Sequence, residues 1–204
     1  LLTVDDRFGI TSSFDSGTGT LTLTGVDTPA NYQAILRSVK YQNTSDTPSA
    51  SRVISFTVND GTVDSNTATR TVNITAVNDA PALATSTGTL AYTENDSPTA
   101  IDGGLTINDI DTAQLTGATV TISGNFQTGE DELAFVNQLG ISGSWSAGTG
   151  VLTLTGNASA ADYQTALRTV TYENLSDNPS TLDRTITFSV TDGTSNVRCW
   201  LSVP

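Results

Sequence analysis

Apolar and polar residues alternate along several short segments of this chain, which is the pattern of half-buried β-strands. In segments 53–58 and 186–190, apolar residues at every second position are separated by Ser or Thr. Segments 20–24 and 151–155 contain Leu residues that alternate with Thr in the same way. β-Branched Thr on the wet side of a strand favours antiparallel sheets with one buried face. The pattern predicts an all-β protein.

One stretch in each half of the chain follows a helical period instead. Thr28 and Pro29 have the identities of an N-cap and a first helical residue, and Ser159 begins a similar stretch. The apolar residues that follow at helical spacing are Tyr32, Ile35, Leu36 and Val39 in the first stretch, and Tyr163, Ala166, Leu167 and Val170 in the second. We therefore expect a short helix in each half, docked on the sheet just before the strands through Tyr41 and Tyr172.

The two halves are copies of one another. Segment 9–62 recurs as segment 140–194, about 131 residues later, and roughly half of the residues are shared, which is typical of tandem repeat proteins. In both copies an Asp-Gly pair, at 60–61 and 192–193, predicts a hairpin turn. Segment 72–77 then reads as the returning last strand of the first copy.

The boundary between the copies falls at segment 76–81, where Pro81 ends strand pairing and the next strand pattern begins at segment 90–92. We predict two domains. Residues 1–79 form a partial repeat that lacks its first strands, the counterpart of segment 81–131. Residues 80–204 form a second repeat with an atypical C-terminal end after Asn196.

Charge and composition narrow the function. The chain has 21 acidic and 8 basic residues, a formal charge of −13, no His and a single Cys, Cys199. Such a surface repels nucleic acid and anionic membranes and attracts cations. Without His, the commonest general base and zinc ligand are missing. No apolar run approaches the ~20 residues of a membrane span, so we expect no membrane insertion.

Carboxylates collect where the predicted strands end. Asn78 and Asp79 lie at the repeat boundary, Asp109 and Asp111 form a D-x-D in which strand alternation would aim both side chains the same way, and Asp192 closes a strand. One end of an antiparallel sandwich would bring these residues together. Clustered carboxylates repel one another unless a cation lies among them, and Ca²⁺ prefers oxygen ligands from flexible loops. The alternative is that they are solvated turn residues.

Segment 76–81, AVNDAP, together with the later D-x-D and the TDGT turn, resembles the D-x-N-D-N-x-P linker and companion motifs of cadherin repeats. Up to Asn196 the chain is similar to the bacterial cadherin-like repeats of large surface adhesins of the RTX-adhesin type. Its Tyr-x-Asn and Asp-Pro segment is similar to chondroitin-sulfate-proteoglycan-type repeats. The resemblance implies tandem Ig-like Greek-key β-sandwiches. It also implies Ca²⁺ held between successive repeats by the matching residues Asn78, Asp79, Asp109, Asp111 and Asp192.

The match departs from the cadherin pattern in ways that change the expected site. Ala76 stands where the linker has its first Asp, and no L-D-R-E motif is present. The resemblance therefore implies one or two ions at the joint. Asp46 is a weaker candidate that would substitute from the upstream repeat. Asp60 would serve an upstream joint and Glu94 a downstream one.

We accordingly predict a non-enzymatic structural or adhesive module of a large extracellular or cell-surface protein, whose partners are neighbouring repeats of the same protein. One alternative is Ca²⁺-dependent binding of a polysaccharide or protein, for which Trp145, Phe126 and Tyr92 are candidate platforms. Another is self-association, in which a strand from a neighbouring chain completes the exposed edges of the partial repeat to give fibres.

The acidic triplet at 130–132 is expected to be a solvated turn. Repeated arginines, including Arg184, are expected to pair with acids.

Overall fold

The computed structural model describes all residues from 1 to 204 and consists mainly of short β-strands with two eight-residue helices. The predicted all-β class is confirmed. The chain divides into two compact units, unit 1 at Leu1–Ala76 and unit 2 at Val77–Pro204, which are described separately. No helix has the length and apolar character needed to cross a bilayer.

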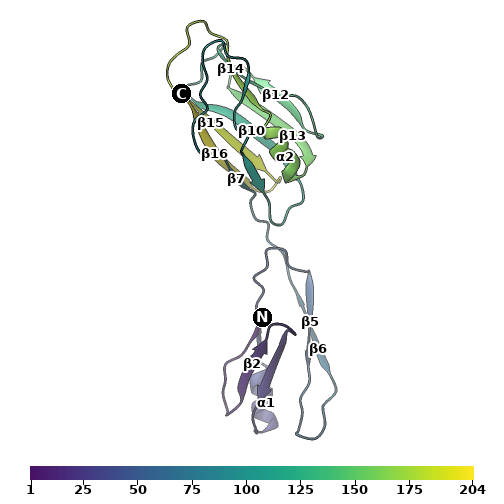
Figure 1. Cartoon of the computed structure of the whole chain (residues 1–204). Helices are drawn as coiled ribbons and strands as arrows, with labels where there is room; N and C mark the ends of the chain where they lie inside the picture. The colour runs from purple at the N-terminus through teal and green to yellow at the C-terminus, as the bar shows by residue number, and fades with distance from the viewer. The chain divides into compact units, whose positions relative to one another are not determined.

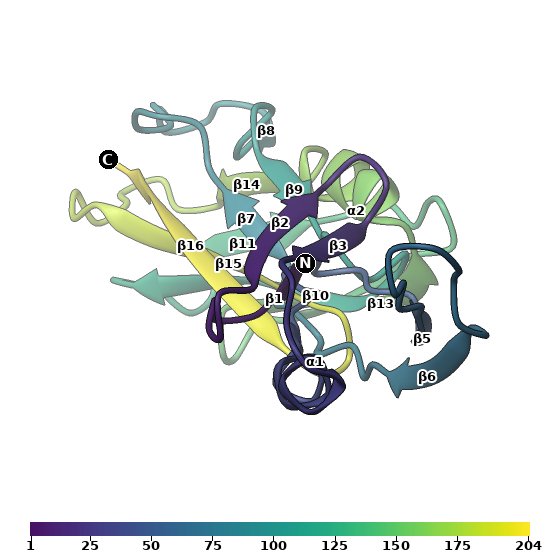
Figure 2. The same ribbon diagram turned by 90° about the horizontal axis from the view of Figure 1, so that it is seen from below.

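Unit 2 is built on a five-stranded antiparallel sheet with β10 (Leu115–Gly124) at its centre. Across this sheet the order is β12 (Ser142–Ser146), β13 (Val151–Ala158), β10, β15 (Arg184–Thr191) and β16 (Asn196–Val203). The edge strand β16, yellow in Figures 1 and 2, pairs with β15 along its whole length. The segment predicted to be an atypical end thus forms a regular strand.

Smaller groups of strands complete unit 2. A three-stranded sheet contains β11 (Asp131–Ala134), β14 (Thr171–Asn174) and β8 (Thr99–Ala100), and a separate pair contains β7 (Ala82–Ala84) and β9 (Thr106–Asn108). Buried side chains from both of the larger sheets form a single apolar core, including Val120 and Phe188 from the first sheet and Leu133 and Tyr172 from the second. Because both sheets contribute inward-facing residues, the core lies between them.

Helix α2 (Ala160–Leu167) forms as the spacing predicts. Ser159 caps it: its Oγ accepts a hydrogen bond from the backbone N–H of Asp162 at 3.1 Å, and the Asp162 carboxylate accepts from the Ser159 backbone N–H. This reciprocal capping box satisfies N–H groups that have no partner within the helix. Tyr163 and Leu167 are buried, and the helix packs against β9 and β10.

Unit 1 contains three separate two-stranded ribbons and one helix. The ribbons are β1 (Leu2–Thr3) with β4 (Lys40–Tyr41), β2 (Thr11–Asp15) with β3 (Thr20–Thr24), and β5 (Ser51–Phe56) with β6 (Ala68–Asn73). Helix α1 (Pro29–Leu36) is capped by Thr28, as predicted. Only Ile10 and Ile35 are buried apolar residues of this unit.

Several predicted strand positions are wrong. The last strand of unit 1 is β6, which ends at Asn73, so most of segment 72–77 is not a strand. Its limit is set by its partner, because Asn73 pairs with Ser51, the first residue of β5. Strand β5 itself ends at Phe56 and not at Val58. The strand expected at 90–92 is absent, and the short β7 precedes that position.

Candidate functional site

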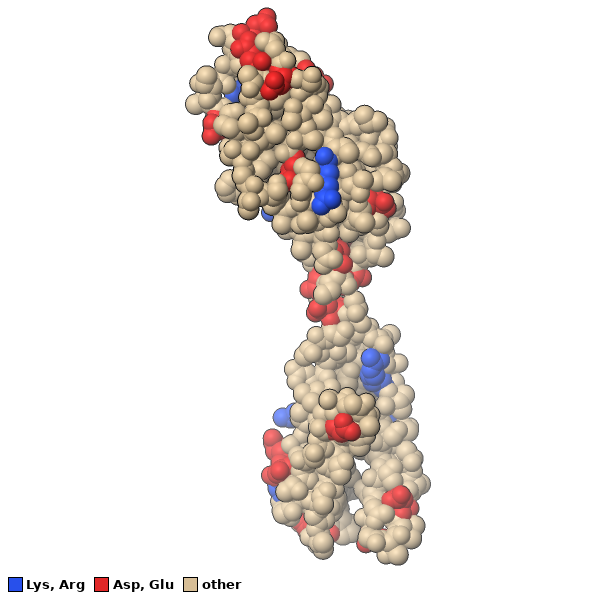
Figure 3. Space-filling model, viewed as in Figure 1, with Lys and Arg blue, Asp and Glu red and all other residues tan.

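Three segments of unit 2 carry the residues that the sequence singled out. Asn78 and Asp79 lie in the segment before β7, Asp109 and Asp111 lie in the turn after β9, and Asp192 lies in the turn between β15 and β16. The antiparallel pairing of β7 with β9 places the first two segments next to each other, since Ala82 is opposite Asn108. Acidic side chains are visible at this end of unit 2 (Figure 3).

Hydrogen bonds link the three segments directly. Asn78 Nδ2 donates to Asp192 Oδ2 at 2.8 Å, and the Asp79 backbone N–H donates to Asp111 Oδ2 at 2.9 Å. Thr112 Oγ1 donates to Asn78 Oδ1 at 3.3 Å. The structure therefore brings together Asn78, Asp79, Asp111 and Asp192, with Asp109 in the same turn as Asp111. We call these five residues the linker cluster.

Two of the carboxylates also organise their own turns. Asp109 Oδ1 accepts the backbone N–H groups of Asp111 at 3.3 Å and Thr112 at 3.0 Å. Asp192 Oδ1 accepts those of Thr194 and Ser195, both at 2.6 Å. The argument from strand alternation is wrong for the D-x-D, because β9 ends at Asn108 and both acids lie in a bend. They reach the cluster through turn geometry instead.

The cluster contains a carboxylate oxygen without a partner. Asp109 Oδ2 is buried and accepts no hydrogen bond, although burying an unpaired charged oxygen is unfavourable. Burial raises the pKa of Asp192, but hydrogen bonds from Asn78, Ser195 and Thr194 outweigh it and hold that pKa below its ordinary value. Asp192 is therefore ionised at neutral pH.

The donor set fits a hard cation in chemical type, but the side chains do not form a closed cage. The side chains of Asp109, Asp111 and Asp192, with the amide oxygen of Asn78, are oxygen donors of the kind that Ca²⁺ uses. No three acidic side chains converge closely enough to enclose an ion as they stand. Any ion here would need further oxygens from backbone carbonyls or water.

The weaker candidates lie outside the linker cluster. Asp60 belongs to unit 1, where its Oδ1 accepts the backbone N–H groups of Thr62 and Val63 at 2.8 and 2.9 Å. Asp46 is exposed in the loop after β4 of unit 1. Glu94 is exposed in the loop between β7 and β8. That loop meets the last residues of β16 through a hydrogen bond from the Leu90 N–H to the Ser202 carbonyl, at the strand end opposite Asp192.

The expectation of a solvated acidic turn at 130–132 is wrong for its central residue. Asp131 is buried and pairs with Arg184 at 3.1 Å, and it also accepts hydrogen bonds from Tyr172 Oη at 2.7 Å and Asn174 Nδ2 at 2.8 Å. Burial and the bond to Asp131 raise the pKa of Tyr172. One sequence signal could have indicated this buried pairing. The partners of Asp131, Arg184 and Tyr172, recur in the first copy as Arg52 and Tyr41.

The aromatic residues considered as ligand platforms pack against the core of unit 2. Tyr92 meets Tyr172 edge to face, with ring centroids 5.1 Å apart, and Phe126 meets Trp145 in the same manner at 6.3 Å. Among the aromatic residues of unit 2, the exposed one is instead Trp200, on the edge strand β16, with 69% of its surface accessible. The structure therefore shows no row of exposed rings at the three predicted positions.

The fold and the linker cluster together define a class of protein. It is β-rich, has internal repeats and carries acidic turn residues where the chain enters its second unit. A stretch of 140 residues is 39% identical to part of Halomucin from Haloquadratum walsbyi (strain DSM 16790 / HBSQ001), and it covers 65% of this chain. The chain spans only 2% of the length of Halomucin, so the match concerns a small part of a much longer protein. No protein-family model and no solved structure matches the chain.

Proposed function

We propose that this chain is a non-enzymatic structural or adhesive segment of a long extracellular repeat protein, in which Ca²⁺ at the linker cluster fixes the entry to a repeat. The similarity to Halomucin favours a surface or structural protein. The internal repeat supports the same view, because repeats build length and valency.

The observation that carries the Ca²⁺ proposal is the buried, unpartnered Asp109 Oδ2 in the linker cluster. A cation beside this oxygen would supply the missing partner and would also offset repulsion among Asp109, Asp111 and Asp192. Asn78 Nδ2 donates a hydrogen bond to Asp192 Oδ2, which already offsets part of the repulsion among these carboxylates. With an ion bound, the amide could turn so that its oxygen faces the cation.

Binding at this place would have a mechanical consequence. Asn78 and Asp79 belong to the segment by which the chain enters unit 2, and their contacts with Asp111 and Asp192 already attach that segment to two turns. An ion shared by the segment and the turns would restrict the backbone dihedral freedom of the entry. A repeat that precedes the segment would then have fewer accessible orientations.

Calcium titration of the full chain tests the proposal. Both tryptophans, Trp145 and Trp200, lie in unit 2, so tryptophan fluorescence follows the unfolding of this unit alone. Extracellular Ca²⁺ modules bind with Kd on the order of 0.1–1 mM. At a free Ca²⁺ concentration of ~100 Kd, linkage stabilises the folded state by about 2.7 kcal/mol, and EDTA should remove that gain. X-ray scattering with and without Ca²⁺ should show a narrower distribution of shapes when the ion is present.

Asp109→Asn and Asp192→Asn should each weaken the Ca²⁺-dependent stabilisation by at least tenfold in Ca²⁺ concentration. The matched control is Asp60→Asn, which changes the corresponding Asp-Gly turn of the first copy and leaves the linker cluster intact. Identical melting curves and scattering profiles in Ca²⁺ and in EDTA would exclude the proposed role. Mg²⁺ at equal concentration is a control for general charge screening.

A further inference from the structure

The five-stranded sheet of unit 2 has an outer face that is rich in hydroxyl groups. Along β10, β13 and β15 the apolar residues face the core, and the residues between them, such as Thr119, Thr153 and Ser189, lie on the other side of the sheet. Hydroxyl groups of neighbouring strands meet there, since Ser123 Oγ lies 2.7 Å from Thr187 Oγ1. None of the five strands contains an Asp or a Glu, although the chain has 21 acidic residues. The face is therefore polar but free of negative charge.

Two exposed side chains lie at one side of this face, on the edge strand β16. Trp200 is 69% exposed, and Arg198, two residues earlier and on the same side of the strand, is exposed as well. Val197, Cys199 and Leu201 alternate with them and pack in the core. Arg198 forms no salt bridge within the chain, so its guanidinium is free to bind an anion.

Each of the two side chains begins a row of hydroxyl groups that crosses the sheet. The rows follow the strand register over β15 and β10, through Thr187 and Thr121 from Trp200, and through Ser189 and Thr119 from Arg198. Because neighbouring strands lie ~4.8 Å apart, the five strands present a surface ~19 Å wide. An extended ligand that lies along these rows contacts an aromatic ring, a guanidinium and several hydroxyl groups at once.

The strand that carries Trp200 and Arg198 is fixed along both of its edges. One edge pairs with β15 along the whole length of β16. On the other edge, the Trp200 carbonyl accepts a hydrogen bond from Thr85 Oγ1 at 3.4 Å, and the Ser202 carbonyl accepts one from the Leu90 N–H at 3.2 Å. Since these backbone groups already have partners, this part of the edge does not favour the addition of a further strand. Recognition by side chains of the outer face is favoured instead.

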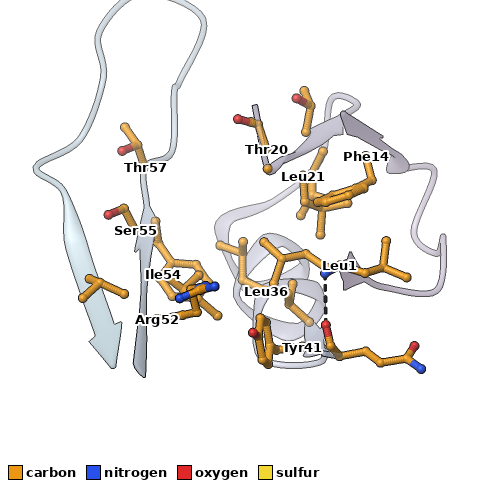
Figure 4. Close-up of a pocket in the computed structure, with 18 of the residues that line it drawn as sticks. Leu1, Phe14, Thr20, Leu21, Leu36, Tyr41, Arg52, Ile54, Ser55 and Thr57 are labelled. Carbon is orange, nitrogen blue, oxygen red and sulfur yellow. Dashed lines mark hydrogen bonds between the residues drawn. The ribbon is translucent and has the colours of Figure 1, made fainter. Parts of the chain in front are cut away.

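Unit 1 has the same alternation but lacks the aromatic ring. Figure 4 shows Ile54 on the apolar side of β5 and Ser55, the counterpart of Thr187, pointing to the other side. Opposite Ser55 lies Thr69, where unit 2 has Trp200. Hydroxyl groups are thus common to both copies, because Thr favours the exposed side of a strand. The exposed ring and the guanidinium beside it distinguish unit 2 and indicate its ligand.

We propose that this face of unit 2 binds an anionic polysaccharide, with a sugar ring stacked on Trp200 and a carboxylate of the polymer held by Arg198. The C–H groups on the face of a sugar ring pack against an indole ring, and Ser and Thr hydroxyls both donate to and accept from sugar hydroxyls. A guanidinium binds a carboxylate through two parallel hydrogen bonds. Because the strands contain no acids, the net charge of −13 exerts little repulsion at this face once salt screens the more distant carboxylates.

Calorimetric titration of the full chain with oligosaccharides of alginate, a polymer of uronic acids, tests this proposal. The titration is made in EDTA, which removes any contribution of Ca²⁺ at the linker cluster and separates this proposal from the proposed function. We expect saturable binding and a change in tryptophan fluorescence, because the ligand covers Trp200. Oligosaccharides of the neutral polymer dextran should bind at least tenfold more weakly, since they offer no carboxylate to Arg198. Added salt should weaken the binding of alginate more than that of dextran.

Two variants assign the binding to the face. Trp200→Ala and Arg198→Gln should each weaken the binding of alginate at least tenfold, and Arg198→Gln should also remove the preference over dextran. Both side chains are exposed, so the variants should fold, which urea unfolding followed by the fluorescence of Trp145 verifies. The matched controls are Leu182→Ala, which truncates an exposed apolar side chain of a loop, and Arg70→Gln, which removes the same charge from an exposed position of unit 1. Both controls should leave the affinity unchanged.

Absence of saturable binding in EDTA would overturn the proposal, as would equal binding of alginate and dextran. An equal loss of affinity in Arg70→Gln would also overturn it, because the attraction would then depend on total charge and not on Arg198. So would a dimer that forms without sugar and is lost in Trp200→Ala, since a second copy would then occupy the face. Loss of affinity confined to Trp200→Ala and Arg198→Gln would support the proposal.

Discussion

Replacing Asp131 by Ala removes the carboxylate that pairs with Arg184, and it therefore tests how much this buried ion pair contributes to the stability of unit 2. The side chains of Asp131 and Arg184 are 0% and 4% exposed. Asp131 also accepts hydrogen bonds from Tyr172, Asn174 and the backbone N–H of Gln127. The substitution leaves a buried guanidinium without a counter-charge and two side-chain donors without their acceptor.

The expected loss of stability follows from this unpaired buried charge. Breaking a buried ion pair by removing one partner costs about 3–5 kcal/mol, because the remaining charge stays desolvated. Arg184 already has one guanidinium nitrogen, Nη2, without a partner, and its Nη1 donates to the carbonyls of Ser180 and Leu182. The guanidinium therefore stays fixed in place after the substitution. Adding Arg184→Met should recover at least about 1 kcal/mol, since it removes the unpaired charge.

Urea unfolding followed by tryptophan fluorescence measures this effect in unit 2. With a slope of ~1.5 kcal/mol per M, a loss of ~4 kcal/mol lowers the midpoint by roughly 2–3 M. Glu132→Ala is the matched control, because Glu132 is the next residue of β11 and points to the other side of the strand, and it should shift stability by no more than about 0.5 kcal/mol. An Asp131→Ala variant that loses no more unfolding free energy than Glu132→Ala would contradict this prediction. A double variant less stable than Asp131→Ala alone would also contradict it.

Two further predictions concern titrating groups in unit 2. Burial, with a smaller contribution from Asp102, raises the pKa of the Cys199 thiol to about 11. At pH 8 only about one thiol in a thousand is then ionised, so iodoacetamide should label Cys199 at least tenfold faster in urea than in the folded chain, and equal rates would contradict the burial. The pKa of Asp192 is lower in the folded chain than its ordinary value of 3.8, so the stabilisation that Asp192 provides is complete above that value and is lost as pH falls through the folded pKa. Asp192→Asn should therefore flatten the dependence of unit 2 stability on pH in acid, and an unchanged slope would refute this assignment.

Local signals predicted the helices well. In both helices the cap is a single side chain close in sequence to its partner: Thr28 accepts from the Asn31 N–H, and Ser159 accepts from the Asp162 N–H. Such contacts depend little on the rest of the fold. The end of β6 depends on where β5 begins, and this pairing is not encoded in the apolar pattern of β6 itself. Strand limits were accordingly the less accurate part of the prediction.

The candidate site shows the same contrast. The convergence of Asn78, Asp79, Asp111 and Asp192 could be predicted because antiparallel topology brings certain turns to one end of a sandwich. The burial of Asp131 could not, because three consecutive acids have the local character of an exposed turn. Its environment is decided by Arg184, which lies 53 residues later in the sequence.

The two copies also separate what an alternating pattern specifies from what it leaves open. Leu21 and Leu152 lie in almost identical segments and face inward in both units, yet only the second is fully buried. Alternation therefore specifies which face of a strand is apolar, whereas burial depends on the strand that packs beside it. Full burial of a Val, Leu or Phe side chain stabilises a fold by about 1.5–3 kcal/mol. Leu21 should therefore contribute less to the stability of unit 1 than Leu152 contributes to that of unit 2.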